Sequence, residues 1–190
     1  FHFLRALSKK FKNLIVSTGA TYDSEISKAN SILKKAKIDY SFLHCVTLYP
    51  TPLNELHLSR IKYLQKFTSK IGFSDHSKTS SKNALVASKA SIVFGAKIIE
   101  RHVTILDKNQ TRDGKVSIVP EDIRRIKDFS KLSVENQKNF LKKFQYNFKG
   151  NPKRSLSDKE LLNRRYYRGR FGSFNQKENR FINNWEEVEF

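Results

Sequence analysis

The sequence predicts an α/β fold, part of a (βα)8 TIM barrel with about four βα units, followed by a basic irregular tail. Short apolar segments alternate with longer segments of helical periodicity, which is the pattern of βα units. Four landmarks at the ends of the apolar segments, Ser17, Cys45, Ser74 and Arg101, are 28, 29 and 27 residues apart. This spacing is close to the length of one βα unit, so the four segments are predicted to be successive parallel strands.

The first two units are read from residues 1–52. A helix is expected up to residue 12, with apolar residues on one face and lysines on the other. An apolar strand follows at 14–19, a helix at about 23–36 and a second strand at 40–45. Two prolines in the loop at 47–52 prevent a regular helix from starting earlier.

The third and fourth units repeat the pattern. They comprise expected helices at 55–67 and 83–94, and expected strands at 70–73 and 97–100. A long loop at about 104–119 leads to a helix that Pro120 opens. These units are compatible with part of an eight-fold barrel or with a doubly wound sheet.

Side-chain alternation along the strands favours the barrel. Residues that share a phase at the strand ends are Cys45, Thr47 and Tyr49 in the second unit, Ser74 and His76 in the third, and Glu100 and His102 in the fourth. Polar groups therefore collect at the carboxyl ends of successive strands. This is where βα barrels carry their catalytic residues.

His76 and His102 are the strongest candidates for a metal site. They are 26 residues apart, so in a parallel sheet they lie at equivalent ends of neighbouring strands. Two neutral imidazoles there could share one divalent ion and leave positions for substrate and water. A lone histidine is more often a hydrogen-bonded structural residue, and Glu100 could be a ligand, a partner of a ligand or part of an ion pair.

Three further positions allow two interpretations each. Ser17 and Ser74 could donate to a phosphate near a helix N-terminus, or they could cap a helix, which is the commoner use of serine. Asp113, followed by Gly114, could present a carboxylate to a polar substrate or simply form a turn.

The formal charge is +19, which raises the possibility of nucleic-acid or other polyanion binding. Most of the excess is lysine scattered through helical segments, and no nucleic-acid-binding motif is present, so we expect solvated helix faces instead. Beyond residue 146 the composition changes to Gly, Asn, Arg and aromatic residues. We therefore predict a barrel portion at 1–146 and a basic tail or linker at 147–190. The basic run at 163–170 could contact phosphate or wrap the surface.

Composition also limits the location. No run of about 18 apolar residues exists, and residues 1–12 lack the features of a signal peptide, so a cytoplasmic protein without membrane contact is expected. The single cysteine, Cys45, excludes an internal disulfide framework. Phe1 in place of a methionine suggests a processed, truncated or partial chain.

Four motifs, in this order and spacing, resemble those of the sialic acid synthase family, the N-acetylneuraminate synthase-like enzymes. They are VSTG at 16–19, LHCVTLYPTP at 43–52, GFSDHS at 72–77 and GAKIIERHVT at 95–104. The segment RDGKVSI at 112–118 is similar to the loop that follows the last barrel strand in that family. The resemblance covers about residues 4–132.

The resemblance implies a transferase that condenses phosphoenolpyruvate with an N-acylated amino sugar to give a nonulosonic acid. It implies a divalent metal, Mn²⁺ or Mg²⁺, bound by two histidines, and a homodimer when the protein is complete. The positions match as follows: His76 and His102 to the metal ligands, Ser17, Thr47 and Ser74 to contacts of phosphoenolpyruvate, and Tyr49 and Asp113 to residues facing the acceptor sugar. Thr47 stands where the family often has Ser or Asn.

The chain also departs from the family. The resemblance places its start near the helix before the fifth strand of the barrel, and the family's C-terminal antifreeze-like domain is not recognisable in residues 151–190. A half-barrel would expose an open edge and an apolar face, so we expect this fragment to be inactive alone. Two alternatives remain: a non-catalytic basic fragment that binds polyanions or partner proteins, and another phosphoenolpyruvate-using aldol-type synthase.

Overall fold

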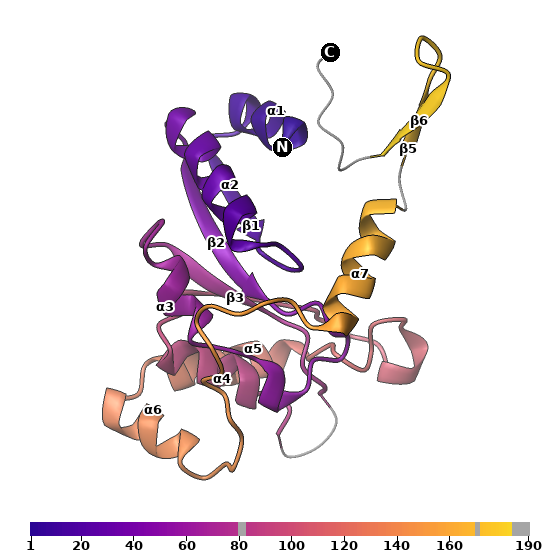
Figure 1. Cartoon of the computed structure of the whole chain (residues 1–190). Coiled ribbons are helices and arrows are strands. Elements are labelled where there is room, and N and C mark those ends of the chain that lie inside the picture. The colour runs from indigo at the N-terminus through magenta and orange to yellow at the C-terminus, as the bar shows by residue number, and fades with distance from the viewer. Residues whose placement is uncertain (80–82, 170–171, 184–190) are drawn as a thin grey trace. The chain divides into compact units, whose positions relative to one another are not determined.

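The computed structural model describes residues 1–79, 83–169 and 172–183 (Figure 1). Its strands are β1 (Asn13–Ser17), β2 (Asp39–Cys45), β3 (Ile71–Asp75), β4 (Ile98–Arg101), β5 (Gly172–Asn175) and β6 (Arg180–Asn183). Its helices are α1 (His2–Lys10), α2 (Asp23–Lys35), α3 (Arg60–Leu64), α4 (Val86–Val93), α5 (Pro120–Ser130), α6 (Val134–Leu141) and α7 (Asp158–Gly169), with short 3-10 turns η1 (Leu53–Glu55) and η2 (Lys108–Gln110). Across these described residues, no helix is both long and apolar enough to cross a membrane.

The first four strands form one sheet in the order β1-β2-β3-β4. β2 pairs with β3 and β3 pairs with β4 in parallel register. Helices α2, α3 and α4 lie between successive strands along the chain. The strand order follows the chain without reversal, as in a βα barrel, so the predicted α/β fold with four successive βα units is confirmed.

Gly72, in the middle strand β3, allows the neighbouring strands β2 and β4 to place Leu43 and Ile98 close to its backbone. It is paired with Leu43 on one side and with Ile98 on the other. A Cβ atom at this position would lie 2.4 Å from Leu43 Cδ2 and 2.5 Å from the Ile98 carbonyl oxygen. The side chains of the neighbouring strands therefore fill the space that a larger residue would need.

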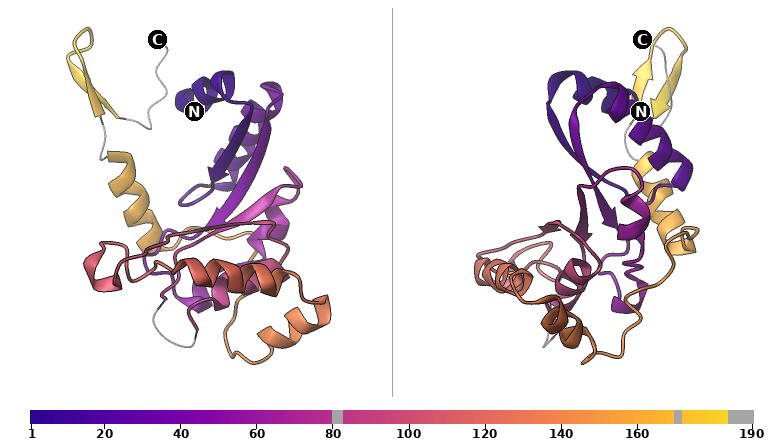
Figure 2. Two further views of the ribbon diagram at one scale, coloured as in Figure 1. Left: turned by 180° about the vertical axis from the view of Figure 1, so that it is seen from behind. Right: turned by 90° about the vertical axis from the view of Figure 1, so that its left-hand side faces the viewer.

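The chain forms two compact units. One comprises residues 15–19 and 41–154, and the other residues 1–14, 20–40 and the described part of 155–190. In the first unit α4 packs on β3, and α5 and α6 pack on α4 (Figures 1 and 2). Its fully buried apolar side chains come from these layers and from the segment around α3, and include Phe42, Leu56, Leu58, Ile61, Leu64, Ile71 and Phe73.

The helix expected at 55–67 is interrupted. His57 has a left-handed backbone conformation, with φ of 48°, which ends η1 and separates it from α3. The next two N–H groups, of Leu58 and Ser59, donate to the carbonyl groups of Phe148 and Lys149 instead of entering a helix. A tertiary contact therefore overrides the local helical pattern.

Residues 147–152 add to this same unit. Phe148 is buried, and the Arg60 guanidinium donates to the carbonyl oxygen of Pro152 at 2.9 Å. Six residues that the sequence assigned to the tail thus lie against the segment at 57–60. The sequence-based domain boundary itself stays a prediction.

In the other unit, the expected irregular tail contains regular structure. Helix α7 begins with a capping box in which the Ser157 hydroxyl and the Glu160 carboxylate each bond the other residue's backbone N–H. Farther along α7, Arg164 forms a bidentate ion pair with Glu25 of α2, at 2.6 and 2.8 Å. The Arg164 guanidinium also lies 4.2 Å from the ring centre of Tyr22. β5 and β6 form a two-stranded antiparallel hairpin.

His44 is a fully buried histidine on β2. Its Nε2–H donates to the carbonyl oxygen of Leu56 at 2.7 Å. Burial is the main cause that lowers the pKa of His44 to about 3, against the opposing effect of that hydrogen bond and with help from the nearby charges of Arg60 and Arg154. The imidazole is therefore neutral in the folded protein near pH 7.

Replacing Gly72 with Ala is expected to destabilise the 190-residue chain by about 1–3 kcal/mol, because the added methyl group overlaps Leu43 and Ile98. Urea unfolding followed by circular dichroism measures the change. Ser130→Ala, at an exposed position on α5, is the matched control and should leave the midpoint unchanged. An unchanged midpoint for Gly72→Ala would contradict the close approach of the three strands.

Acid should destabilise the chain through His44. In the unfolded state this histidine binds a proton below its ordinary pKa of 6.5, whereas the folded state binds it only near pH 3, so stability is lost as pH falls between these values. At pH 5 the loss amounts to about 2 kcal/mol. Urea unfolding at pH 7, 6 and 5 should show this loss in the wild type and a smaller one in His44→Gln. Equal losses in both proteins would exclude His44 as the cause.

Candidate active site

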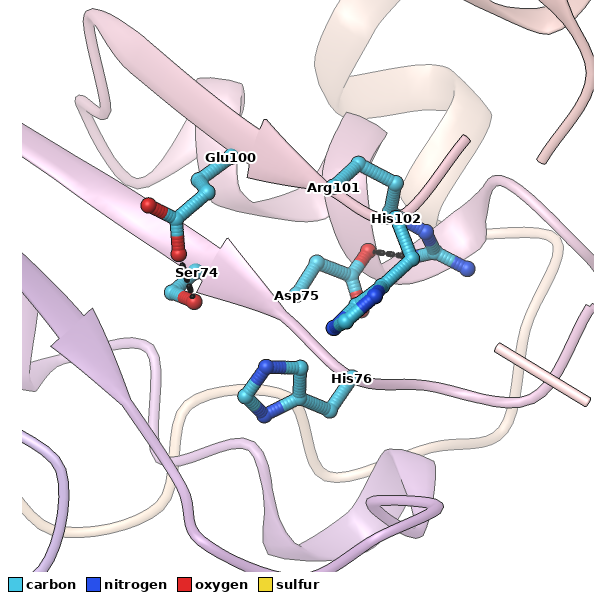
Figure 3. Close-up of a pocket in the computed structure, with 6 residues that line it drawn as sticks. All are labelled: Ser74, Asp75, His76, Glu100, Arg101 and His102. Carbon is cyan, nitrogen blue, oxygen red and sulfur yellow. Dashed lines mark hydrogen bonds and ion pairs between the residues drawn. The ribbon is translucent and has the colours of Figure 1, made fainter. Parts of the chain in front are cut away.

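The candidate site lies where β3 and β4 end. Their register pairs Ser74 with Glu100 and Asp75 with Arg101, and each strand continues directly into a histidine. The pocket here is lined by Ser74, Asp75, His76, Glu100, Arg101 and His102 (Figure 3). Two parallel strands in register thus place two equivalent tripeptides side by side, as the 26-residue spacing predicted.

The two histidine rings share this space with one tyrosine. The ring centres of His76 and His102 are 5.6 Å apart. The ring of Tyr49, from the loop after β2, lies 5.2 Å from that of His76 and 5.8 Å from that of His102. The structure therefore brings together three of the side chains that the sequence singled out.

Asp113 joins this group from the long loop after β4. Its carboxylate accepts a hydrogen bond of 2.7 Å from the Tyr49 hydroxyl, and its other oxygen lies 3.8 Å from Nδ1 of His102. Gly114 lets the loop fold back closely, since a Cβ there would lie 1.8 Å from the carbonyl oxygen of Lys108. Lys108 in turn donates to the carbonyl and hydroxyl oxygens of Thr79, which anchors the loop. Asp113 is thus part of a tight, tethered turn and also faces the histidines.

His76 is held mainly in its neutral form. Burial lowers its pKa, and the proximity of His102 lowers it further; a backbone hydrogen bond to Val46 and the charges of Asp75 and Glu100 oppose these effects. The Sγ atom of Cys45 lies 3.8 Å from Nδ1 of His76. A neutral imidazole has a lone pair available, as a metal ligand requires.

The donor set fits one divalent ion held by two histidines. Two imidazoles that bind one ion through nitrogen have ring centres no more than about 6.5 Å apart, and the observed separation is within that limit. Among the residues that the structure describes, no group of three or more His, Cys, Asp or Glu side chains is placed to hold a metal. Water and substrate could supply further ligands to an ion bound by the two histidines.

The Ser74 hydroxyl is hydrogen-bonded to a neighbouring carboxylate. Its hydroxyl donates to Glu100 Oε1 at 2.6 Å, across the paired strands (Figure 3). A hydroxyl has one proton to donate. Ser74 would therefore have to exchange this bond before it could donate to a phosphate or carboxylate oxygen.

Ser17 and Thr47 lie outside the lining of this pocket. Ser17 ends β1 and is exposed, while the next residue, Thr18, donates its hydroxyl to the carbonyl oxygen of Leu43. A Cβ on Gly19 would lie 2.9 Å from Thr47 Cγ2 and 3.1 Å from the Cys45 sulfur, so this turn packs against the end of β2. Contacts of Ser17 and Thr47 with a substrate stay predictions.

The sequence reasoning missed a buried ion pair between Asp75 and Arg101. Both side chains are almost completely inaccessible, at 0% and 3% exposed, and they pair across β3 and β4. The signal was present: an acidic residue precedes one histidine and a basic residue precedes the other, at equivalent strand positions. Alternation sends these side chains to the opposite face from Ser74 and Glu100 (Figure 3).

Comparisons with known proteins agree on one family. A profile of the NeuB family matches residues 1–140. The chain is 34% identical over 129 residues to an N,N'-diacetyllegionaminic acid synthase of Campylobacter jejuni, covering 65% of this chain and 37% of that protein. It is 31% identical over 175 residues to a pseudaminic acid synthase of the same species, covering 90% of this chain and 46% of that protein. The chain thus spans less than half the length of these two relatives.

A solved structure extends the agreement to the fold. The crystal structure of an N-acetylneuraminic acid (sialic acid) synthetase from Leptospira borgpetersenii, in complex with citrate, superposes with a TM-score of 0.63 at 30% identity. The superposition covers 86% of this chain and 53% of that one. The profile match, the sequence relatives and the shared fold together confirm the predicted resemblance: this chain belongs to the NeuB family.

Proposed function

We propose that this chain supplies half of the active site of an enzyme that condenses phosphoenolpyruvate with an N-acylated amino sugar to form a nonulosonic acid. The observation that carries the proposal is the convergence of His76, His102 and Tyr49 on one space at the carboxyl ends of parallel strands. Relatives named as sialic-type acid synthases support the reaction class.

In the proposed reaction, C3 of phosphoenolpyruvate forms a bond with the aldehyde carbon of the open-chain sugar, whose oxygen takes up a proton. Water supplies the new oxygen at C2, the C2–O bond to phosphate breaks, and inorganic phosphate leaves. A Mn²⁺ or Mg²⁺ ion held by His76 and His102 would stabilise the negative charge that develops on the aldehyde oxygen.

The residues of this chain have separate parts in the proposal. Tyr49 and Asp113 orient the acceptor sugar by accepting hydrogen bonds from its hydroxyl groups, because the Tyr49 hydroxyl gives its proton to Asp113 and both groups carry acceptor lone pairs next to the histidines. Ser17, Thr47 and Ser74 contact the phosphate or carboxylate of phosphoenolpyruvate. The remaining contacts come from the part of the relatives that this chain does not span, so the chain alone is proposed to be inactive. We further propose a homodimer in the cytoplasm.

Replacing either His76 or His102 with Ala in the complete protein should reduce sugar-dependent phosphate release from phosphoenolpyruvate by about 1,000-fold, since one lost ligand removes most of the charge stabilisation. Phosphate is measured with a coupled assay at saturating Mn²⁺, using a panel of N-acylated amino sugars. His2→Ala, on α1 and outside the pocket, is the matched histidine control. Wild-type rates in both site variants would reject the proposed function.

Tyr49→Phe should raise the KM for the amino sugar about tenfold, because the Asp113 carboxylate loses a hydrogen bond that holds it in place. The KM for phosphoenolpyruvate should stay unchanged. Tyr146→Phe is the control, since Tyr146 also makes a side-chain hydrogen bond, with Asn83, but lies outside the pocket lining. A change in the KM for phosphoenolpyruvate alone would contradict the assignment of Tyr49 to the sugar.

A further inference from the structure

We propose that the Asp75–Arg101 ion pair is a positioning device that sets the separation of His76 and His102. Each member directly precedes one of the histidines, and the two are register partners across β3 and β4. Both side chains are buried. The use of that separation for metal binding rests on the proposed function, but the geometric role does not.

Asp75 holds the backbone that follows His76. Its Oδ1 accepts a hydrogen bond of 2.8 Å from the N–H of Ser77, the residue that follows the histidine. Its Oδ2 accepts one of 2.5 Å from the Ser88 hydroxyl on α4 and pairs with Arg101. His76 is therefore bracketed by two residues that are tied to each other and to a core helix.

Arg101 extends the same tie from β4. It donates to the Ser77 hydroxyl at 3.0 Å and to the Ser77 carbonyl oxygen at 2.9 Å. A longer contact of 3.4 Å reaches the carbonyl oxygen of Ala84. Arg101, which precedes His102, thus bonds directly to Ser77, which follows His76. A shift of the backbone at one histidine is therefore transmitted to the other.

The backbones of the histidines are fixed on their remaining sides. The carbonyl oxygen of His76 accepts from the N–H of Thr51, and that of His102 accepts from the N–H of Ile118, both at 2.9 Å. The ion pair and its contacts with Ser77 connect the two histidine segments directly, at the residues next to the histidines. This connection is where the ring separation of 5.6 Å is set.

Positioning can be separated from stability because the two respond differently to substitution. Removing one member of a buried ion pair leaves an unpaired buried charge and destabilises a protein strongly, whereas replacing both members with apolar residues is often neutral. A double variant, Asp75→Leu with Arg101→Met, should therefore keep the fold and lose the tie between the histidine segments.

The test is an NMR measurement on the histidine-labelled 190-residue chain without metal or substrate. It compares the nuclear Overhauser cross-peak between the rings of His76 and His102 with that between His44 and Phe73, whose ring centres are 5.8 Å apart in the core. Since the cross-peak falls with the sixth power of distance, loosening of about 1 Å should weaken the first roughly threefold in the double variant. The His44–Phe73 cross-peak should persist.

A double variant with both cross-peaks at wild-type strength would overturn the proposal. Loss of the His44–Phe73 cross-peak in the double variant would mean that its core is disrupted. In that case Ser77→Ala is the deciding variant, because it removes one acceptor of Arg101 and leaves the charges in place. A weakened His76–His102 cross-peak in Ser77→Ala supports the proposal, and an unchanged one overturns it. Failure of the phosphate-release assay would reject the proposed reaction without affecting either NMR result.

Discussion

The parallel register of β2, β3 and β4 is the constraint on which the rest of the site depends. It aligns Ser74 with Glu100 and Asp75 with Arg101, so one face of the sheet carries the Ser74–Glu100 hydrogen bond and the other carries a buried ion pair. A slip of one residue would exchange these two faces. Gly72 makes this register possible, because a side chain there would collide with both neighbouring strands.

The sequence predicted the parts of the structure that follow from periodicity. Predicted strand ends at Ser17, Cys45 and Arg101 match the observed ones, and Ser74 lies one residue before the end of β3, because buried parallel strands are short apolar runs with polar residues at their carboxyl ends. The convergence of His76 with His102 followed from spacing and alternation alone.

Structural features that depend on contacts between residues distant in sequence could not be predicted from periodicity. The break at His57 arises because residues near Phe148 take up the N–H groups of the expected helix. Helix α7 begins with a capping box formed by Ser157 and Glu160, and this sequence pattern predicts a helix start. The basic composition of the segment instead led to the prediction of an irregular tail. Whether Arg164 is solvated or paired depends on Glu25, which lies 139 residues earlier in the chain.

The buried ion pair shows how chemistry and positioning are assigned to different residues within one tripeptide. In each of Ser74-Asp75-His76 and Glu100-Arg101-His102, alternation sends the outer residues to one face of the sheet and the middle one to the other, where the Asp75 and Arg101 side chains are buried. A buried pair adds little net stability compared with apolar residues of similar size, because desolvation offsets most of the attraction. Its directional hydrogen bonds, however, restrict where the adjoining residues can lie. A site that needs two imidazoles at one separation gains from that restriction, which apolar packing at the same positions would not provide.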